Sequence, residues 1–291
     1  MSRVEPARAL APAKVNLFLH VGAPGADGYH PLVSLAVFAD VGDRVAVTRA
    51  DAFQLETTGP FAARIDGGPN LIETALDAMA GAMGMEQLPV HVRLDKRLPV
   101  AAGLGGGSSD AATAMKLARD LLSLDLDDDA LTRIAAPLGA DMAMCLGARR
   151  VIARRRGEVL SPAPALPDIH AVLLNPGVPS PTGAVYRAYD AAPRPLADAP
   201  DMPAAFASVE ALADWLRGAR NDLQAPAIRL TPSIGTALEA AAAAPGALLA
   251  RVTGSGATVF ALFGTADAAR AAAETLSEAH PGWWTAACRL A

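Results

Sequence analysis

The chain has 291 residues, a length that predicts two domains of roughly 150 residues each. Its 52% of hydrophobic residues suffices for a sizeable core, and its net charge of −5 argues against a nucleic-acid partner, which usually requires a basic surface. Because no apolar run reaches about 18 residues and the start of the chain lacks a signal-peptide core, we expect a cytoplasmic protein without a membrane partner.

The first half of the chain mixes strand and helix patterns. Residues 13–20 alternate as a strand, with Val15, Leu17 and Leu19 on one face. Lys14, Asn16, Phe18 and His20 share the other face. Further strands are expected over 44–48 and 90–94, and helices over 70–83, 109–122 and 131–138. Asp127, Asp128 and Asp129 precede the last helix, where acidic residues are favourable, so we interpret them as a helix start rather than a metal site.

The second half has the same mixed character. Strands are expected over 151–154, 170–174, 248–253, 258–263 and 284–288, and helices over 233–243 and 266–279. Proline-rich stretches over 175–181 and 191–203 predict loops. Cys145 and Cys288 lack metal-type spacing, and the histidines form no HxxxH pair, so a transition metal and a disulfide framework are not expected. The whole predicts an α+β protein with domains over residues 1–160 and 161–291.

A glycine-rich segment carries the strongest functional signal. Residues 99–112 read PVAAGLGGGSSDAA and lead into an alanine-rich helical pattern. Glycines let a backbone approach a ligand closely, and a helix N-terminus attracts phosphate. Because Ser is preferred at helix starts, we expect Ser108 and Ser109 to cap the helix that follows. The segment lacks the Lys of GxxxxGK[ST] and the spacing of GxGxxG. It therefore predicts a phosphate-binding loop of another kind, with an ordinary tight turn or linker as the alternative.

Three segments together resemble the three motifs of the GHMP kinases. They are residues 11–16 (APAKVN), the glycine-rich segment and residues 252–259 (VTGSGATV). Within that family the chain looks most like the branch that phosphorylates a cytidine-diphosphate-linked methylerythritol in the non-mevalonate pathway of isoprenoid biosynthesis. The supporting strings occur in family order between residue 11 and about residue 263: APAKVNLFLHV, DGYHPL, PNLI, DKRLPVAAGLGGGSSDAA, LGAD, PGVPSPTGAVY, RNDL and VTGSGATVFA.

The resemblance implies a fold, a reaction and catalytic residues. The fold would be a two-domain α+β GHMP kinase with an N-terminal ATP-binding domain and the active site in the interdomain cleft. The reaction would be Mg²⁺-dependent transfer of the ATP γ-phosphoryl group to the 2-hydroxyl of the methylerythritol. Asp141 matches the catalytic base, Lys14 would keep it ionised, and Asn16 would bind the erythritol hydroxyls.

The resemblance also implies binding residues. Tyr29 and Tyr186 would stack on the cytosine and His30 would bind its polar edge, with Thr182, Gly254, Ser255 and Gly256 also on the substrate side. The ATP-binding positions would be Asn70, Leu71 and Lys96, which match positions near the family's adenine pocket, together with Pro99, Val100, Ala101, Ala102, Gly103, Leu104, Gly105, Gly106, Gly107, Ser108 and Ser109. Ser108 or Ser109 would lie near the metal, whose ligands are otherwise open.

Several of these residues also have a purely structural interpretation. Asp141 would cap a turn, Lys14 would be a solvated lysine, the tyrosines would be core residues and Gly254–Gly256 a tight turn. The basic cluster Arg149, Arg150, Arg154, Arg155 and Arg156 is better explained as a solvated strand edge than as a phosphate site.

Two rival functions also stay open: a kinase of the homoserine or mevalonate type, and a nucleotide-binding module without catalysis. No obligate protein partner is inferred. One departure from the family pattern is Ala143, where a Pro is usual, which puts the placement of Asp141 in question.

Overall fold

The computed structural model describes residues 5–65, 68, 70–196, 198 and 201–291. Contacts divide the chain into unit 1, formed by Met1–Ala13, Gly42–Val100 and Gly105–Ala148, and unit 2, formed by Lys14–Val41, Ala101–Leu104 and Arg149–Ala291. Neither unit is contiguous, because the long strands β1 (Ala7–Val21) and β2 (Leu32–Arg49) each contribute residues to both. The division at residue 160 stays a prediction.

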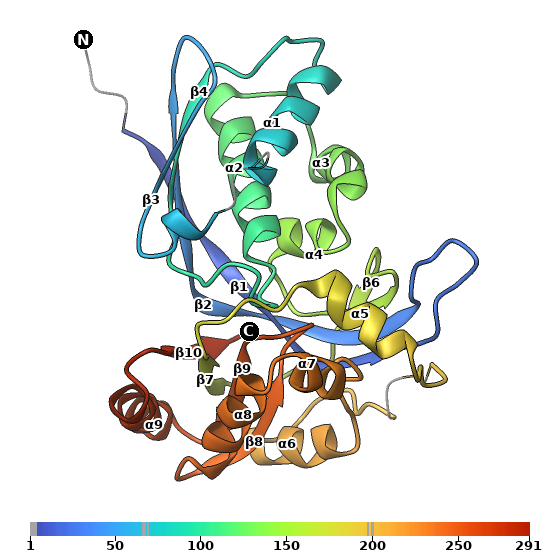
Figure 1. Cartoon of the computed structure of the whole chain (residues 1–291). Coiled ribbons are helices and arrows are strands. Elements are labelled where there is room, and N and C mark those ends of the chain that lie inside the picture. Colours follow the sequence, from blue (N-terminus) through green and yellow to red (C-terminus); the bar gives the residue numbers. More distant parts are fainter. Residues whose placement is uncertain (1–4, 66–67, 69, 197, 199–200) are drawn as a thin grey trace. The chain divides into compact units, whose positions relative to one another are not determined.

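Unit 1 is a small sheet with helices on one face (Figure 1). Strand β4 (Val90–Asp95) pairs antiparallel with β2, joining Arg44 to Asp95, and parallel with β3 (Gln54–Thr58). The helices are α1 (Leu71–Ala82), α2 (Gly106–Leu122), α3 (Asp128–Ala135) and α4 (Met142–Gly147), with 3₁₀ turns over Ala62–Arg64 and Ala136–Leu138. The strands expected near 44–48 and 90–94 and the helices near 70–83 and 109–122 are confirmed.

The helix starts of unit 1 differ in how they are capped. Asn70 Oδ1 accepts from the Ile72 N–H at 2.9 Å, and Asp127 Oδ1 accepts from the Ala130 N–H at 2.7 Å. The latter cap starts α3 three residues before the expected Leu131. Helix α2 has no side-chain cap, because Gly105 holds the cap position in the left-handed region at φ 62°. The expectation that Ser108 and Ser109 cap this helix is therefore wrong, and both lie within its first turn.

Unit 2 is built on four antiparallel strands in the order β10–β7–β9–β8. They are β7 (Ile169–Asn175), β8 (Ala247–Val252), β9 (Val259–Phe263) and β10 (Trp284–Leu290). Strand β5 (Val151–Arg155) pairs antiparallel with the start of β2, joining Ile152 to Leu35, and with β6 (Val159–Pro162). The helices are α5 (Thr182–Asp190), α6 (Val209–Arg217), α7 (Gln224–Leu230), α8 (Ser233–Ala243) and α9 (Ala266–Ala279).

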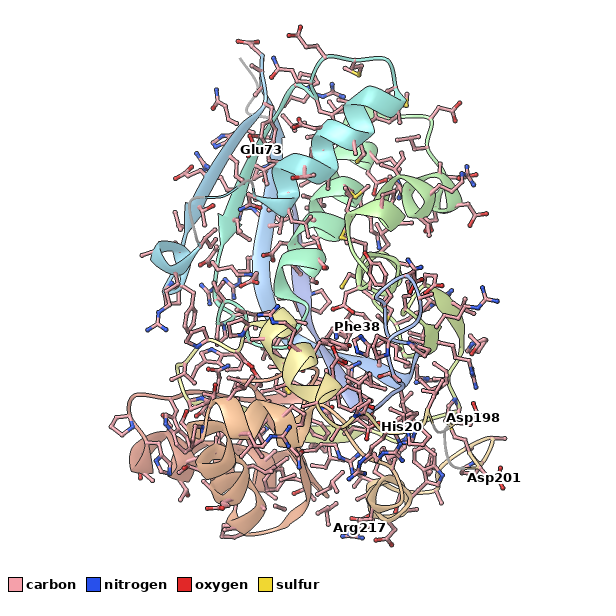
Figure 2. All side chains as sticks on the ribbon, turned by 45° about the vertical axis from the view of Figure 1, so that its right-hand side comes forward. His20, Phe38, Glu73, Asp198, Asp201 and Arg217 are labelled. Carbon is pink, nitrogen blue, oxygen red and sulfur yellow. The ribbon has the colours of Figure 1, made fainter. Side chains whose placement is uncertain are left out.

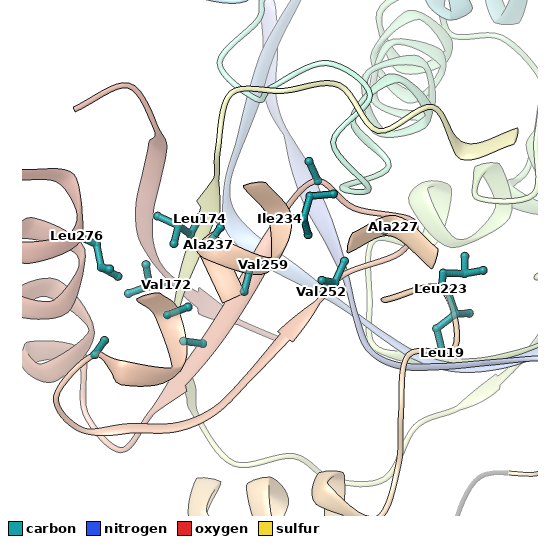
Figure 3. Close-up of a cluster of buried hydrophobic side chains, with 14 of the residues drawn as sticks. Leu19, Val172, Leu174, Leu223, Ala227, Ile234, Ala237, Val252, Val259 and Leu276 are labelled. Atoms are coloured by element: carbon teal, nitrogen blue, oxygen red, sulfur yellow. The ribbon is translucent and has the colours of Figure 1, made fainter. Parts of the chain in front are cut away.

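A buried apolar cluster holds unit 2 together (Figure 3). Ile234 of α8 and Leu276 of α9 pack with Val172 and Leu174 of β7, and Leu19 of β1 joins the same cluster. Removing this apolar surface from water is the main stabilising contribution. The cluster includes Val252 at the end of β8 and Val259 at the start of β9, and so it holds the two ends of the turn between these strands.

The strand expected over residues 13–20 is confirmed as part of β1, and both of its faces are buried from Ala13 to Val21. Phe18 is fully buried, and the polar Lys14, Asn16 and His20 of the same face are buried as well. His20 Nε2 accepts from the Arg220 N–H at 3.2 Å, and His20 Nδ1 lies 3.1 Å from the Asp198 carbonyl oxygen. Figure 2 labels His20 and Asp198. The contact between these two residues anchors the expected 191–203 loop, of which residues 197, 199 and 200 lie outside the described part. Among described residues, no helix has both the length and the apolar character of a membrane span.

Candidate active site

A polar network links the first two strands within unit 2. Lys14 Nζ donates to Asn16 Oδ1 at 2.8 Å, and Asn16 Nδ2 donates to Ser34 Oγ at 2.8 Å. Ser34 Oγ in turn donates to the Phe18 carbonyl at 2.6 Å. Lys14 is only 5% exposed, so the interpretation as a solvated lysine does not hold. Because the hydroxyl of Ser34 fixes the Asn16 amide, the two residues predicted to share a strand face are held in one orientation.

The two glycine segments pack on each other and on β1. The Asn16 N–H donates to Thr253 Oγ1 at 2.9 Å, and the Thr258 N–H donates to the Ala102 carbonyl at 3.1 Å. A Cβ atom at Gly103 would lie 2.5 Å from the Thr253 carbonyl oxygen. Only glycine allows this approach, and the φ of 75° at Gly103 also favours it. The 252–259 segment is thus more than a turn, since it supports residues 101–104.

The predicted substrate residues Thr182 and Ser255 meet next to this turn. Thr182 Oγ1 lies 2.9 Å from Ser255 Oγ, and Ser180 Oγ donates to the Ser255 carbonyl at 2.7 Å. These contacts tie the start of α5 to the turn. Ser255 is 4% exposed, so its hydroxyl faces an interior already fixed by hydrogen bonds.

His30 and Tyr186 are also brought together. Their ring centroids are 4.7 Å apart, and His30 Nε2 lies 2.6 Å from Asp190 Oδ1. Tyr186 is partly buried against the unit 2 core, as the plainer interpretation expected, whereas Tyr29 is 58% exposed and is not a core residue. An exposed aromatic ring such as that of Tyr29 is suited to stacking with a planar base.

Arg156 is a candidate that the sequence interpretation missed. Its guanidinium carbon lies 4.1 Å from the centroid of the Tyr29 ring, and it forms an ion pair with Asp27. Asp27 Oδ1 also accepts from the Tyr29 N–H at 3.0 Å. That hydrogen bond and the charge of Arg156 lower the pKa of Asp27 below its ordinary value. The pairing of β5 with β2 brings Arg156 to this segment, a consequence of register that the basic cluster does not reveal.

In unit 1, Asp141 occupies the residue before α4. Its backbone carbonyl accepts from the Cys145 N–H at 2.9 Å, but its carboxylate makes no cap hydrogen bond to the helix. The Asp141 side chain therefore does not cap α4. Ala143 lies in the first turn of α4, where N–H groups lack an intrahelical partner, so the helix does not depend on a Pro there. Lys14 belongs to unit 2 and Asp141 to unit 1, and their pairing stays a prediction.

The predicted ATP-side residues have structural partners of their own. Asn70 caps α1, which begins at Leu71. Lys96 Nζ lies 2.5 Å from Asp43 Oδ2 and 2.6 Å from Asp110 Oδ2. Burial alone would lower the pKa of Lys96, but the attraction of Asp110 and Asp43 outweighs it and raises that pKa. The ATP contacts of these three residues stay predictions.

The first turn of α2 contains a polar atom suited to a ligand. Ser109 is fully buried, and its Oγ has no hydrogen-bond partner in the described part of the chain. A buried hydroxyl without a partner is costly, so Ser109 Oγ is a candidate contact for a bound ligand, ion or water. Among described residues, no group of three or more His, Cys, Asp or Glu side chains is placed to hold a metal.

Comparison with known proteins identifies the family of the chain. The chain matches the model of the GHMP kinases N terminal domain over residues 70–148 and that of the GHMP kinases C terminal domain over residues 204–282. It is 56% identical over 285 residues to the 4-diphosphocytidyl-2-C-methyl-D-erythritol kinase of Caulobacter vibrioides strain NA1000 / CB15N, covering 97% of this chain and 98% of that protein.

Solved structures give the same result. A crystal structure of 4-(cytidine 5'-diphospho)-2C-methyl-D-erythritol kinase is similar with a TM-score of 0.78 and 37% identity, over 98% of this chain and 99% of that one. A homoserine kinase from Cytophaga hutchinsonii has a TM-score of 0.68 at 18% identity, over 99% of this chain and 96% of that one, which shows a shared fold alone. The predicted α+β GHMP kinase fold is confirmed.

Proposed function

Because the chain belongs to the GHMP kinases, and within them to the 4-diphosphocytidyl-2-C-methyl-D-erythritol kinases, we propose that it transfers the γ-phosphoryl group of ATP to the 2-hydroxyl of 4-diphosphocytidyl-2-C-methyl-D-erythritol. This is a step of non-mevalonate isoprenoid biosynthesis. The observations that carry the choice of acceptor are the exposed ring of Tyr29 and the contact between the His30 and Tyr186 rings, because homoserine and mevalonate have no base to stack on aromatic rings.

The acceptor side of the reaction uses unit 2. Tyr29 and Tyr186 bind the faces of the cytosine, and His30 binds its polar edge. Asn16, whose amide is held by Ser34, binds the erythritol hydroxyls, and Lys14 neutralises charge near the acceptor. Thr182 and the 254–256 turn complete this side. The site therefore positions one hydroxyl for in-line attack on a phosphoryl group.

Asp141 accepts the hydrogen bond of the acceptor hydroxyl and takes its proton as the new P–O bond forms. In a loose transition state that proton leaves late, so orientation of the hydroxyl contributes as much as basicity. Because Asp141 makes no cap hydrogen bond, its carboxylate does not serve the helix that follows.

The donor side uses the glycine-rich segment. The N-terminus of α2 directs its unpaired N–H groups and positive dipole end at the ATP phosphates. Kinases of this kind act on ATP with a divalent cation, and we propose Mg²⁺. The unpartnered hydroxyl of Ser109 fits an oxygen-preferring ion that keeps several waters and binds mainly through phosphates. When bound, the ion neutralises phosphate charge. We place the reaction in the cytoplasm, where both nucleotides are expected.

The test is ADP release by the purified protein with Mg-ATP and each of four acceptor conditions: the cytidylated methylerythritol, homoserine, mevalonate and none. Turnover only with the cytidylated alcohol is expected. Turnover with homoserine or mevalonate would keep the fold and overturn the assignment of Tyr29, His30 and Tyr186. ATP binding without any turnover would favour a non-catalytic module.

A further inference from the structure

A buried ionic cluster in unit 1 lies at both ends of the glycine-rich segment. It consists of Asp43 on β2, Lys96 just after β4, and Asp110 in the early part of α2. The part of the glycine-rich segment that is expected to bind ATP phosphates, residues 99–109, lies between Lys96 and Asp110 along the chain. One ammonium group therefore joins the residues on either side of that segment.

The contacts of the cluster are short and buried. Lys96 Nζ donates to Asp43 Oδ2 at 2.5 Å and to Asp110 Oδ2 at 2.6 Å. Asp43 Oδ1 also accepts from the backbone N–H groups of Arg97 at 2.5 Å and Leu98 at 2.8 Å. Asp43 is fully buried, and Lys96 and Asp110 are 4% and 3% exposed. Asp43 thus fixes the backbone that enters the glycine-rich segment, while Asp110 fixes the helix turn that leaves it.

The cluster also lies directly under the start of α2. A Cβ atom at Gly106, the first residue of the helix, would lie 3.1 Å from Lys96 Nζ and 3.7 Å from Asp43 Oδ2. The helix has no side-chain cap, so its first turn depends on such contacts for its position. A buried cation near a positive helix end would repel it unless carboxylates compensate, which Asp43 and Asp110 do.

We propose that Lys96 is a positioning residue that, through Asp43 and Asp110, holds both ends of the glycine-rich segment in the conformation that binds the ATP phosphates. This inference rests on the proposed function, since it takes that segment as the phosphate site. It differs from an adenine-contact role, because two of the three N–H donors of Lys96 are directed at carboxylates of its own unit.

The experiment compares Lys96→Met, Asp110→Asn and the double variant with the wild type. The matched control is Arg97→Ala, whose partly exposed side chain pairs with Asp95 outside the cluster. Calorimetry measures the affinity of each protein for ATP, ADP and adenosine, and steady-state kinetics give KM for ATP and kcat. Wild-type binding of ATP is measured first, because its absence would count against the proposed function and not against the role of Lys96.

We expect Lys96→Met and Asp110→Asn each to weaken ATP and ADP binding by about 10- to 100-fold, because small misplacements of a binding loop are costly. Adenosine affinity should change less than about twofold, and the double variant should be no weaker than the worse single variant, because both act through one cluster. The control should match the wild type.

An adenosine affinity that falls as much as that for ATP in Lys96→Met would show a direct contact and overturn the proposal. Unchanged ATP binding in Asp110→Asn would overturn it as well. If Lys96→Met does not fold, the near-isosteric Asp110→Asn variant is sufficient as the test. If Lys96 only contacted the adenine, Asp110→Asn would bind ATP and ADP as tightly as the wild type.

Discussion

At the scale of single residues, the two predicted catalytic residues Lys14 and Asp141 differ in their surroundings. A lysine that is 5% exposed requires fixed partners, and Asn16, itself held by Ser34, supplies one of them. Asp141 lies at a helix start without capping it. The burial of Lys14 and the place of Asp141 at a helix start are thus structural observations, and the catalytic roles of both residues stay predictions.

The role of Asp141 gives the first prediction. Asp141→Asn should lower kcat by about 10²- to 10⁴-fold, the usual contribution of a positioned proton acceptor. The KM for the cytidylated acceptor should change little, because the amide keeps the shape of the carboxylate. The control is Asp129→Asn, an exposed substitution in the first turn of α3. A loss of kcat under about threefold would remove Asp141 from the mechanism.

Arg156 gives a second prediction at this scale. Arg156→Ala should raise the acceptor KM by about 2- to 5-fold with kcat unchanged, because an exposed cation–π contact contributes about 0.5–1 kcal/mol. The measurement is steady-state kinetics at saturating ATP, with the exposed Arg149→Ala as the matched control from the same basic cluster. An unchanged KM would show that Arg156 does not contribute to acceptor binding and is a solvated residue of the strand edge, as the sequence interpretation expected.

At the scale of elements, the end of α6 depends on a buried arginine. Arg251 of β8 donates to the Leu216 carbonyl at 2.8 Å and the Ala219 carbonyl at 2.9 Å, at the C-terminal end of the helix. It also donates to the Leu17 carbonyl of β1 at 2.8 Å. Burial lowers the pKa of Arg251 to about 10, so it stays charged at neutral pH. One side chain thereby joins α6, β8 and β1.

We therefore expect Arg251→Met to destabilise the protein by about 3 kcal/mol, because three buried carbonyl groups lose a charged donor. Urea unfolding followed by circular dichroism measures the change. Arg229→Met serves as the control, since Arg229 donates to the Ala188 carbonyl at an exposed site. Equal midpoints for the two variants would show that the carbonyl groups find other partners.

At the scale of the whole molecule, the two units share the chain in an interleaved way. Unit 2 requires β1 and the first part of β2 as well as residues 149–291, and Leu19 and Val21 of β1 belong to its buried cluster. A cut at one point in the chain therefore does not separate the units. This differs from domains that follow one another along a sequence.

We predict that residues 149–291, expressed alone, do not fold cooperatively. Without β1 and β2 the cluster of unit 2 loses part of its apolar cover, and β5 loses its pairing with β2. Thermal unfolding monitored by circular dichroism tests this against the full chain. A sharp transition in the isolated fragment would show that unit 2 is complete without the N-terminal strands.

The sequence by itself determined the strands around Lys14 and the turn at 254–256, most long helices and the family. Those features depend on local periodicity, on glycines and on motif order, which are all readable along one chain. It did not predict the short helices α5, α6 and α7, whose formation relies on packing over a few turns. Short segments carry too little periodic signal to be distinguished from loops.

Only the tertiary structure decided which polar residues meet. Arg156 reaches Tyr29 through strand register, and Lys96 is held between carboxylates from β2 and α2, whose residue numbers differ by 67. The Ser residues of the glycine-rich segment lie inside the helix because the left-handed Gly105 takes the cap position. Hydrogen bonds and ion pairs between distant segments depend on which surfaces the apolar core brings together, and a single sequence does not encode that pairing locally.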